Sequence, residues 1–278
     1  MAILCIVSVS AVLAIHSGPG EAFAEDSAPV ALAPSPAFQE IRADGPAAVY
    51  RAASPAAVSF TANPAAQERP PAGPASHDIR PGYGVTEILW LSDYLPALKN
   101  TPGDTPIYVM QGDREGGTFL LLGGTHANEI AGIMAATLVV ERGAVSRGTV
   151  IIIPHANNSA AQYNDGTRHS GTPDWIELTT ASGETRRFRY GSRRTAVEDQ
   201  APDPEVFVHP LGGEEIEGPE ARNLNRTHPG KADGTLTEQM SYALFQLVER
   251  EGVDVVVDMH EASISSRLAY MLVCHPRA

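Results

Sequence analysis

The sequence predicts an α/β fold, with a mostly parallel mixed sheet and helices on both of its faces. Short, almost uninterrupted apolar runs at residues 118–122, 148–154 and 253–259 are typical of strands that are buried on both faces. Helical periodicity lies between them, at residues 129–142 and 235–251. Strands that alternate with helices in this way form βαβ units, whose strands are parallel and whose crossover is right-handed.

The composition fits one sizeable domain with extensions. The chain has 278 residues, of which 43% are hydrophobic, and a formal net charge of −13. This negative charge disfavours nucleic acid and anionic membrane surfaces as partners, because both repel an acidic protein.

The first 24 residues resemble a secretory signal peptide. Ile3–Ile15 is an uncharged apolar run, too short to span a bilayer as a mature helix, and Ala22–Ala24 fits the A-x-A cleavage pattern. We therefore expect an exported protein, periplasmic or secreted, whose mature chain begins at Glu25. No Lys or Arg precedes the run, so the signal is atypical or the start codon is placed too late. A buried N-terminal helix is the alternative.

Residues 25–81 are rich in Ala and Pro and have few large apolar side chains. Such a composition buries too little surface to offset chain entropy, so we expect a disordered linker that tethers the folded domain. The domain itself is expected to cover residues 82–278.

The domain is expected to open with a helical or strand-turn segment at residues 85–98. Residues 105–110 follow as a strand, and the polar turn 111–117 predicts a hairpin with the strand at 118–122. Residues 267–274 should form one more strand.

A long polar insertion, approximately residues 157–218, interrupts the domain. It is rich in Gly, Arg, Asp and Pro and shows no sustained period. An irregular insertion of this length is usually a lid or a substrate-binding loop, or else poorly ordered.

The candidate site begins where the strand at 118–122 ends. Gly123 and Gly124 are followed by His126 and Glu129, and Asn128 or Thr125 is expected to cap the helix from Glu129 to Arg142. Ligands of open α/β sheets bind beyond the carboxyl ends of the strands, which is where this His and Glu should meet. Imidazole and carboxylate together are good zinc ligands.

A second histidine comes from the end of another strand. His260 directly follows the apolar run 253–259, so it should lie at the same edge of the sheet as His126 and Glu129. Three protein ligands, with a fourth position left for water, are typical of catalytic zinc. Asp258 lies on the same side of the strand as His260 and could fix the tautomer of that ring by accepting a hydrogen bond. Taken alone, His260 could equally be a core or capping histidine.

The stretch Asn223–Arg226 is the second candidate site. A guanidinium beside a primary amide suits a substrate carboxylate, because Arg can bind it through two parallel hydrogen bonds. Asn225 and Arg226 are therefore candidate substrate-binding residues, although an isolated Asn-Arg pair is more often part of a surface loop.

Three ordered motifs resemble the succinylglutamate desuccinylase/aspartoacylase family, within the zinc-carboxypeptidase-like (M14) group. They are GGTHANE at residues 123–129, NLNRTHPG at residues 223–230 and DMHE at residues 258–261. The resemblance implies a hydrolase of amide bonds with one Zn²⁺ per chain, bound by His126, Glu129 and His260. It also implies that Asn225 and Arg226 hold the carboxylate of a small-molecule or peptide substrate.

The sequence departs from the pattern of that family in three ways. The family more often has Asp where Asn223 stands. An arginine that stabilises the carbonyl oxygen is usual just upstream; Arg222 is the nearest candidate, although its spacing is not the usual one, and Arg193 and Arg194 are rivals. The glutamate that takes a proton from zinc-bound water normally comes several tens of residues after the third ligand. We therefore expect either a C-terminally truncated domain that lacks this base or, as the rival, Glu261 as the base.

The expected function is hydrolysis of an N-acyl amino acid by a zinc enzyme. A metallocarboxypeptidase that acts on peptides is the alternative among enzymes. A zinc-bearing binding module without catalysis is the alternative outside them.

Overall fold

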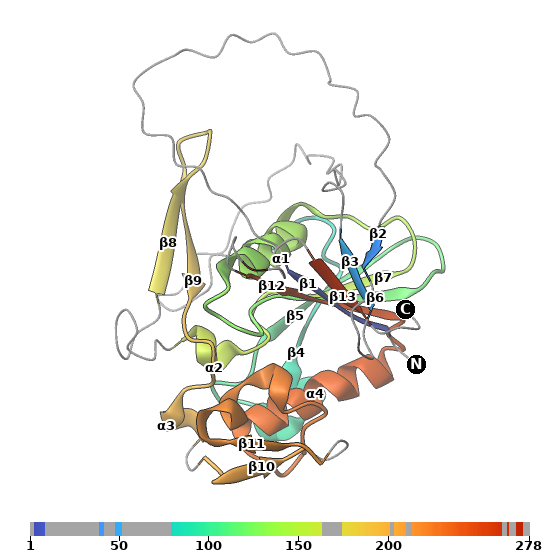
Figure 1. Cartoon of the computed structure of the whole chain (residues 1–278). Coiled ribbons are helices and arrows are strands. Elements are labelled where there is room, and N and C mark those ends of the chain that lie inside the picture. Colours follow the sequence, from blue (N-terminus) through green and yellow to red (C-terminus); the bar gives the residue numbers. More distant parts are fainter. Residues whose placement is uncertain are drawn as a thin grey trace.

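The computed structural model describes residues 3–8, 39–41, 48–51, 79–162, 174–200, 203–209, 213–262, 266 and 271–274. A nine-stranded mixed sheet forms its centre (Figure 1), with the strand order β2-β3-β13-β1-β12-β6-β7-β5-β4. The strands are β1 (Ile3–Ser8), β2 (Gln39–Ile41), β3 (Ala48–Arg51), β4 (Glu87–Trp90), β5 (Pro106–Gln111), β6 (Thr118–Leu122), β7 (Thr149–Ile153), β12 (Val255–His260) and β13 (Met271–Cys274).

Only the middle of the sheet is parallel. β1, β12, β6 and β7 run in one direction, and the remaining five pairings of the sheet are antiparallel. The α/β class with a mixed sheet is therefore confirmed, and the prediction that it is mostly parallel is wrong. Apolar runs indicate that a strand is buried, but they do not show the direction in which it runs beside its neighbours.

The predicted hairpin between β5 and β6 is also wrong. β7 lies between these two strands, parallel to β6 and antiparallel to β5, and β5 instead forms a hairpin with β4. Two short 3₁₀ turns, Leu91–Asp93 and Pro96–Leu98, join β4 to β5. A turn of a few residues permits direct pairing but does not enforce it, because the apolar β7 gains more burial between the two strands.

Two helices cover opposite faces of the sheet (Figure 1), as the sequence predicts. α1 (Ile130–Arg142) packs on the face that carries Leu121 and Ile152, while α4 (Leu236–Arg250) packs on the face that carries Leu120 and Ile153. Alternate residues of one strand thus enter two separate cores, as the period of two requires. In the described part of the chain, no helix is both long and apolar enough to cross a membrane.

The insertion is more regular than the sequence predicts. It contains the short helices α2 (Asn158–Ala161) and α3 (Val197–Gln200), the hairpin β8–β9 (Asp174–Thr179 and Thr185–Tyr190) and the hairpin β10–β11 (Val206–Val208 and Glu215–Glu217). The alternation of buried and exposed residues in β9 cannot be recognised from apolar residues in the sequence, because two of the buried residues are arginines, Arg186 and Arg189.

A buried ion pair anchors the β8–β9 hairpin to α1. Arg186 donates to both carboxylate oxygens of Glu141, at 3.0 and 2.6 Å, and both residues are less than one-tenth exposed. The backbone N–H of Arg80 donates to the same carboxylate at 3.0 Å. Glu141 lies in the last turn of α1, and Arg186 lies in β9, the second strand of the hairpin.

The N-terminal segments differ from their predictions in part. Ile3–Ser8, within the predicted signal peptide, forms β1 between β12 and β13. Cleavage after Ala24 stays a prediction, and it would remove β1 from between β12 and β13. β2 and β3 lie inside the segment 25–81, so the prediction of an uninterrupted disordered linker does not hold for these two strands. β-Forming residues such as Val49 and Tyr50 set β3 apart from its Ala- and Pro-rich surroundings.

Candidate metal centre

The loop between β6 and α1 carries the first two candidate ligands. Gly124 turns the chain with a φ of 67°, in the left-handed region that favours glycine. Gly132 lets α1 approach β12 closely, since a Cβ there would lie 2.7 Å from the carbonyl oxygen of Met259. His126 and Glu129 thereby come to the carboxyl end of the central strands.

Glu129 occupies the N-cap position of α1, one residue before the first helical turn. The expected capping by Asn128 or Thr125 is wrong, because Glu129 is the N-cap residue and the Thr125 hydroxyl donates to Asp258 at 2.8 Å. The carboxylate of Glu129 makes no capping bond and turns toward the histidines.

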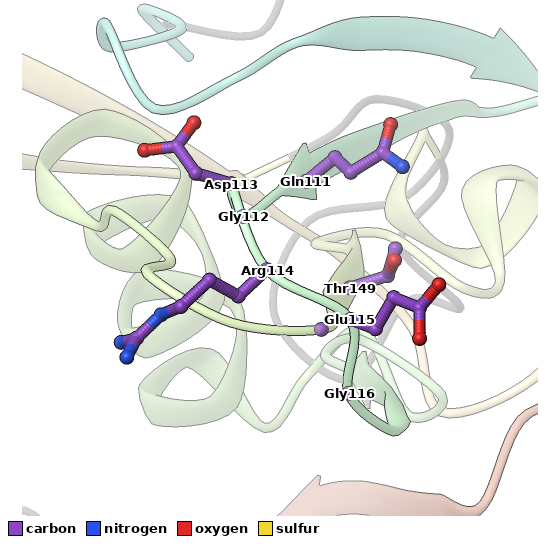
Figure 2. A pocket seen from close by; sticks show the side chains of 8 residues that line it. Gln111, Gly112, Asp113, Arg114, Glu115, Gly116 and Thr149 are labelled. Atoms are coloured by element: carbon purple, nitrogen blue, oxygen red, sulfur yellow. The ribbon is translucent and has the colours of Figure 1, made fainter.

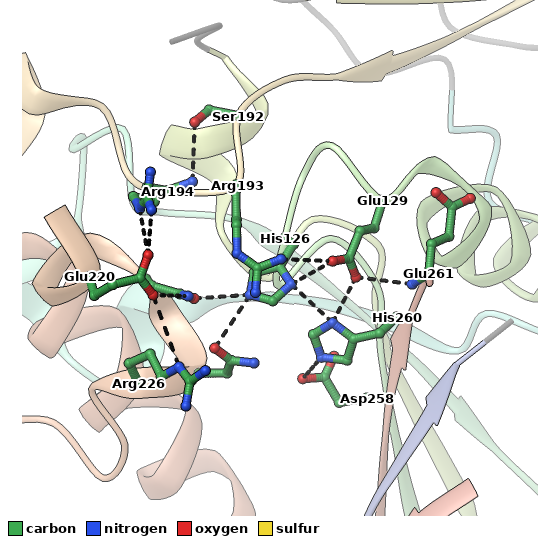
Figure 3. A network of polar contacts seen from close by, with 12 residues as sticks. His126, Glu129, Ser192, Arg193, Arg194, Glu220, Arg226, Asp258, His260 and Glu261 are labelled. Atoms are coloured by element: carbon green, nitrogen blue, oxygen red, sulfur yellow. Dashed lines mark hydrogen bonds and ion pairs between the residues drawn. The ribbon is translucent and has the colours of Figure 1, made fainter. Parts of the chain in front are cut away.

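His126, Glu129 and His260 converge at one point (Figure 3), where their ligand atoms all lie within 4.8 Å of one another. The Nδ1 atoms of the two histidines are 3.1 Å apart. Each also contacts one oxygen of Glu129, at 2.8 Å from His126 and 2.7 Å from His260. All three residues are buried or nearly so.

The outer nitrogens of both rings face oxygen acceptors. His126 Nε2 lies 2.9 Å from Asn223 Oδ1, and His260 Nε2 lies 3.0 Å from Asp258 Oδ2. An oxygen of either kind can only accept, so each Nε2 carries a hydrogen and each Nδ1 points inward. Two Nδ1 atoms and a carboxylate that face one another at these distances are held together either by a shared proton or by a cation.

This donor set fits a zinc ion. Zinc bound tetrahedrally by nitrogen and oxygen at about 2.0–2.1 Å places its ligand atoms about 3.3 Å apart. The three observed contacts are a few tenths of an ångström shorter, a small adjustment for side chains. Histidine pairs whose outer nitrogens donate to a carboxylate or amide oxygen are typical of zinc sites.

The ionisation of the site follows from the same contacts. Burial alone would lower the pKa of His260, but hydrogen bonds and negative charge from Asp258 and Glu129 raise it to about 10. Burial would raise the pKa of Glu129, yet its hydrogen bonds with His126 and His260 hold that pKa far below the ordinary range. Without a metal, a protonated His260 supplies the positive charge beside the ionised Glu129, and a bound metal ion would displace that proton.

The three candidate arginines lie in different places. Arg193 reaches the centre, donating to Glu129 Oε1 at 3.1 Å, and its side chain is 38% exposed. Arg194 pairs with Glu220, whereas Arg222 is buried, donating to Asp203 and to the Thr195 carbonyl. The structure therefore brings Arg193 alone of the three to the candidate metal ligands.

The predicted carboxylate-binding residues lie at the rim of the centre. Asn225 Oδ1 is 3.3 Å from His126 Nε2, and the side chain of Arg226 is 60% exposed. Glu220, a residue that the sequence analysis missed, lies 4.0 Å from Arg226 and accepts from Asn223. The spacing of three residues among Glu220, Asn223 and Arg226 is the signal that could have found it.

The Glu261 carboxylate is hydrogen-bonded to the start of α1. Its carboxylate accepts from the Ala131 N–H at 2.7 Å, in the first turn of α1, and its own N–H donates to Glu129 at 3.0 Å. Figure 3 shows the Glu261 carboxylate turned away from the two histidines. This side chain stabilises the start of the helix that carries Glu129.

One pocket lies away from this centre, beside the first residues of β6 and β7. It has a volume of about 490 Å³ and is lined by Asp113, Arg114 and Glu115 (Figure 2), which belong to the loop between β5 and β6. No histidine lines it. The metal centre is identified by its donors, not by a large cavity.

Comparisons with protein-family models and with curated proteins give no match. Among solved structures, the chain is similar to a succinylglutamate desuccinylase/aspartoacylase from Rhodobacter sphaeroides, with 23% identity and a TM-score of 0.34. An aspartoacylase family protein from Mesorhizobium loti gives 24% and 0.33, and the product-bound ectoine utilization protein EutE (DoeB) from Ruegeria pomeroyi gives 22% and 0.32. These three matches are partial.

Each match covers 56% of this chain and 32–34% of the other. The chain thus spans about a third of the length of these structures. With scores this low, the functional argument depends on the residues of the centre.

Proposed function

We propose that the chain carries the metal centre of a zinc-dependent hydrolase that cleaves an amide bond in a carboxylate-bearing substrate, of the N-acyl amino acid deacylase type. One observation carries the proposal: the Nδ1 atoms of two histidines and a carboxylate meet at the carboxyl ends of parallel strands. Arginine side chains at the rim then supply groups that recognise anions.

The residues have distinct roles in this proposal. Zinc, when bound by His126, Glu129 and His260, supplies an activated water and polarises the scissile carbonyl. Arg226, largely exposed, binds the substrate carboxylate through parallel hydrogen bonds, with Asn225 beside it. Arg193 is placed to stabilise negative charge that develops on the carbonyl oxygen.

A zinc-bearing binding module is the second candidate, and one observation favours it. Every carboxylate near the centre in the described chain already has a partner. Glu129 bonds the histidines, Asp258 bonds His260 and Thr125, Glu220 bonds Arg194 and Asn223, and Glu261 bonds Ala131. For this second candidate, the expected result is zinc binding with turnover close to background. A metallocarboxypeptidase acting on peptides is the remaining alternative.

Zinc content after dialysis tests the centre. The wild-type chain should retain one zinc per molecule and His126→Ala almost none, with His209→Ala as a control outside the cluster. Equal zinc in wild type and His126→Ala would contradict the ligand assignment.

Hydrolysis assays then separate the functions. N-acyl amino acids, the same compounds with the carboxylate amidated, and peptides with a free C-terminus are compared. Turnover of the free-carboxylate acyl amino acids supports the deacylase, turnover of peptides alone supports the carboxypeptidase, and zinc binding without turnover supports the binding module.

A further inference from the structure

Three side chains of the segment 218–226 share one face. The segment consists of two 3₁₀ helices, Gly218–Arg222 and Leu224–Arg226, joined by Asn223, whose backbone is extended. Direct contacts bring the side chains of Glu220, Asn223 and Arg226 together. The Glu220 carboxylate accepts from Asn223 Nδ2 at 2.9 Å and lies 4.0 Å from Arg226 Nε (Figure 3).

The two oxygens of Glu220 have different partners. Oε1 accepts from the Arg194 guanidinium, with Nε at 3.0 Å, while Oε2 accepts from Asn223. An ionised carboxylate can only accept hydrogen bonds, so it requires the NH₂ end of the Asn223 amide to face it. The oxygen end of Asn223, which is fully buried, must then face His126 Nε2, 2.9 Å away.

The orientation of the Asn223 amide determines which ring nitrogen of His126 carries the hydrogen. Because Asn223 Oδ1 accepts, His126 carries its hydrogen on Nε2 and keeps the Nδ1 lone pair for a cation. An amide can present either end to a neighbour, so Asn223 alone does not fix this tautomer. Glu220, which is held in place by Arg194, fixes the orientation of the Asn223 amide.

We propose that Glu220 is a positioning residue that sets, through Asn223, the tautomer of His126 needed for metal binding. The inference rests on the zinc site proposed above. It assigns a role to a residue that touches neither metal nor substrate, and it links the metal ligand to Arg194 and Arg226 through one carboxylate.

Glu220→Gln tests the direction of the relay. The single oxygen of Gln should stay with the charged Arg194, which turns its NH₂ group toward Asn223 and favours a flipped amide. The flipped amide would donate to His126 Nε2 and place the hydrogen on Nδ1. We expect zinc affinity to fall about tenfold, the lower end of the range for residues behind a ligand, because Asn225 remains as an acceptor at 3.3 Å.

In a chain that also carries Asn223→Asp, Glu220→Gln should raise the zinc affinity instead of lowering it. In that variant the new carboxylate would face the Glu220 carboxylate at the 2.9 Å of the present hydrogen bond, so the two like charges repel and zinc binding should weaken. Adding Glu220→Gln satisfies every contact, since Gln then donates to the new carboxylate and still accepts from Arg194. The double variant should therefore bind zinc more tightly than Asn223→Asp alone.

Zinc affinity is measured by competition with a chromophoric chelator, and circular dichroism of each metal-free variant checks folding. Glu217→Gln, an exposed glutamate of β11, is the matched control and should leave the affinity unchanged. If Glu220 only stabilises the fold, Glu220→Gln should change the zinc affinity by the same factor in the wild-type chain and in the Asn223→Asp variant. That result would overturn the inference. A wild-type chain that binds no zinc overturns the proposed function instead, and the inference with it.

Discussion

Removing the guanidinium of Arg186 should destabilise the chain strongly. The Arg186 and Glu141 side chains are 7% and 5% exposed and share two hydrogen bonds, of 3.0 and 2.6 Å. Arg186→Met keeps much of the side-chain volume but takes the guanidinium away from the buried Glu141 charge. Breaking a buried pair costs about 3–5 kcal/mol, which corresponds to a fall in Tm of roughly 6–20 °C for a domain of this size.

Urea denaturation, followed by circular dichroism, measures the change in the free energy of unfolding. Arg187→Met is the matched control, because the neighbouring Arg187 pairs with Glu177 at the surface and both side chains are more than half exposed. An exposed pair contributes about 0.2–1 kcal/mol. A double variant, Arg186→Met with Glu141→Gln, should be more stable than Arg186→Met alone, because the buried negative charge is removed as well. A loss below about 1 kcal/mol for Arg186→Met, similar to the control, would show that this pair does not hold the hairpin on α1.

Three further predictions follow from single residues. In any form of this chain that turns substrate over, Arg226→Ala should lower kcat/KM by about 10- to 150-fold, the loss of a charge-assisted hydrogen bond of about 1.5–3 kcal/mol; zinc content should not change, and joint loss of zinc would refute the assignment. Burial, with the charge of Glu141, raises the pKa of Tyr108 from 10.0 to about 12, so the folded chain keeps a proton that the unfolded chain releases. The free energy of unfolding should therefore fall as pH rises between those values, less steeply in Tyr108→Phe; equal slopes in urea titrations would contradict this. N-terminal sequencing of exported protein should begin at Glu25, and a retained Met1 would rule out cleavage after Ala24.

The convergence of His126, Glu129 and His260 could be predicted from the sequence because its signals are local. His126 and His260 each follow an apolar run that can only be a buried strand, and the sheet brings strand ends together whatever its edges do. Glu129 lies three residues after His126, so one turn of chain fixes their distance. Asp258 precedes His260 by two residues, which places both on one side of β12, and their 3.0 Å contact follows.

The rest depended on tertiary contacts that spacing does not encode. Arg193 is 64 residues from Glu129, and its approach depends on how the β8–β9 hairpin docks on α1. That hairpin could not be predicted from apolar alternation, because Arg186 takes an inward position that only the partner charge of Glu141 permits. The order of β5, β6 and β7 likewise depends on which of these strands buries the most apolar surface in the middle position, and β7 takes that position.

The separation of the ligands along the chain bears on when the metal can bind. His126 and His260 are 134 residues apart, and they meet because β12 lies directly beside β6. Closing a loop of this length has a large entropic cost, so the contact forms only when most of the sheet has assembled. A cation at this centre would therefore not template early folding and would be acquired by a nearly complete domain. Once bound, it would join β6 and β12 as a reversible cross-link, and its release should accelerate global unfolding.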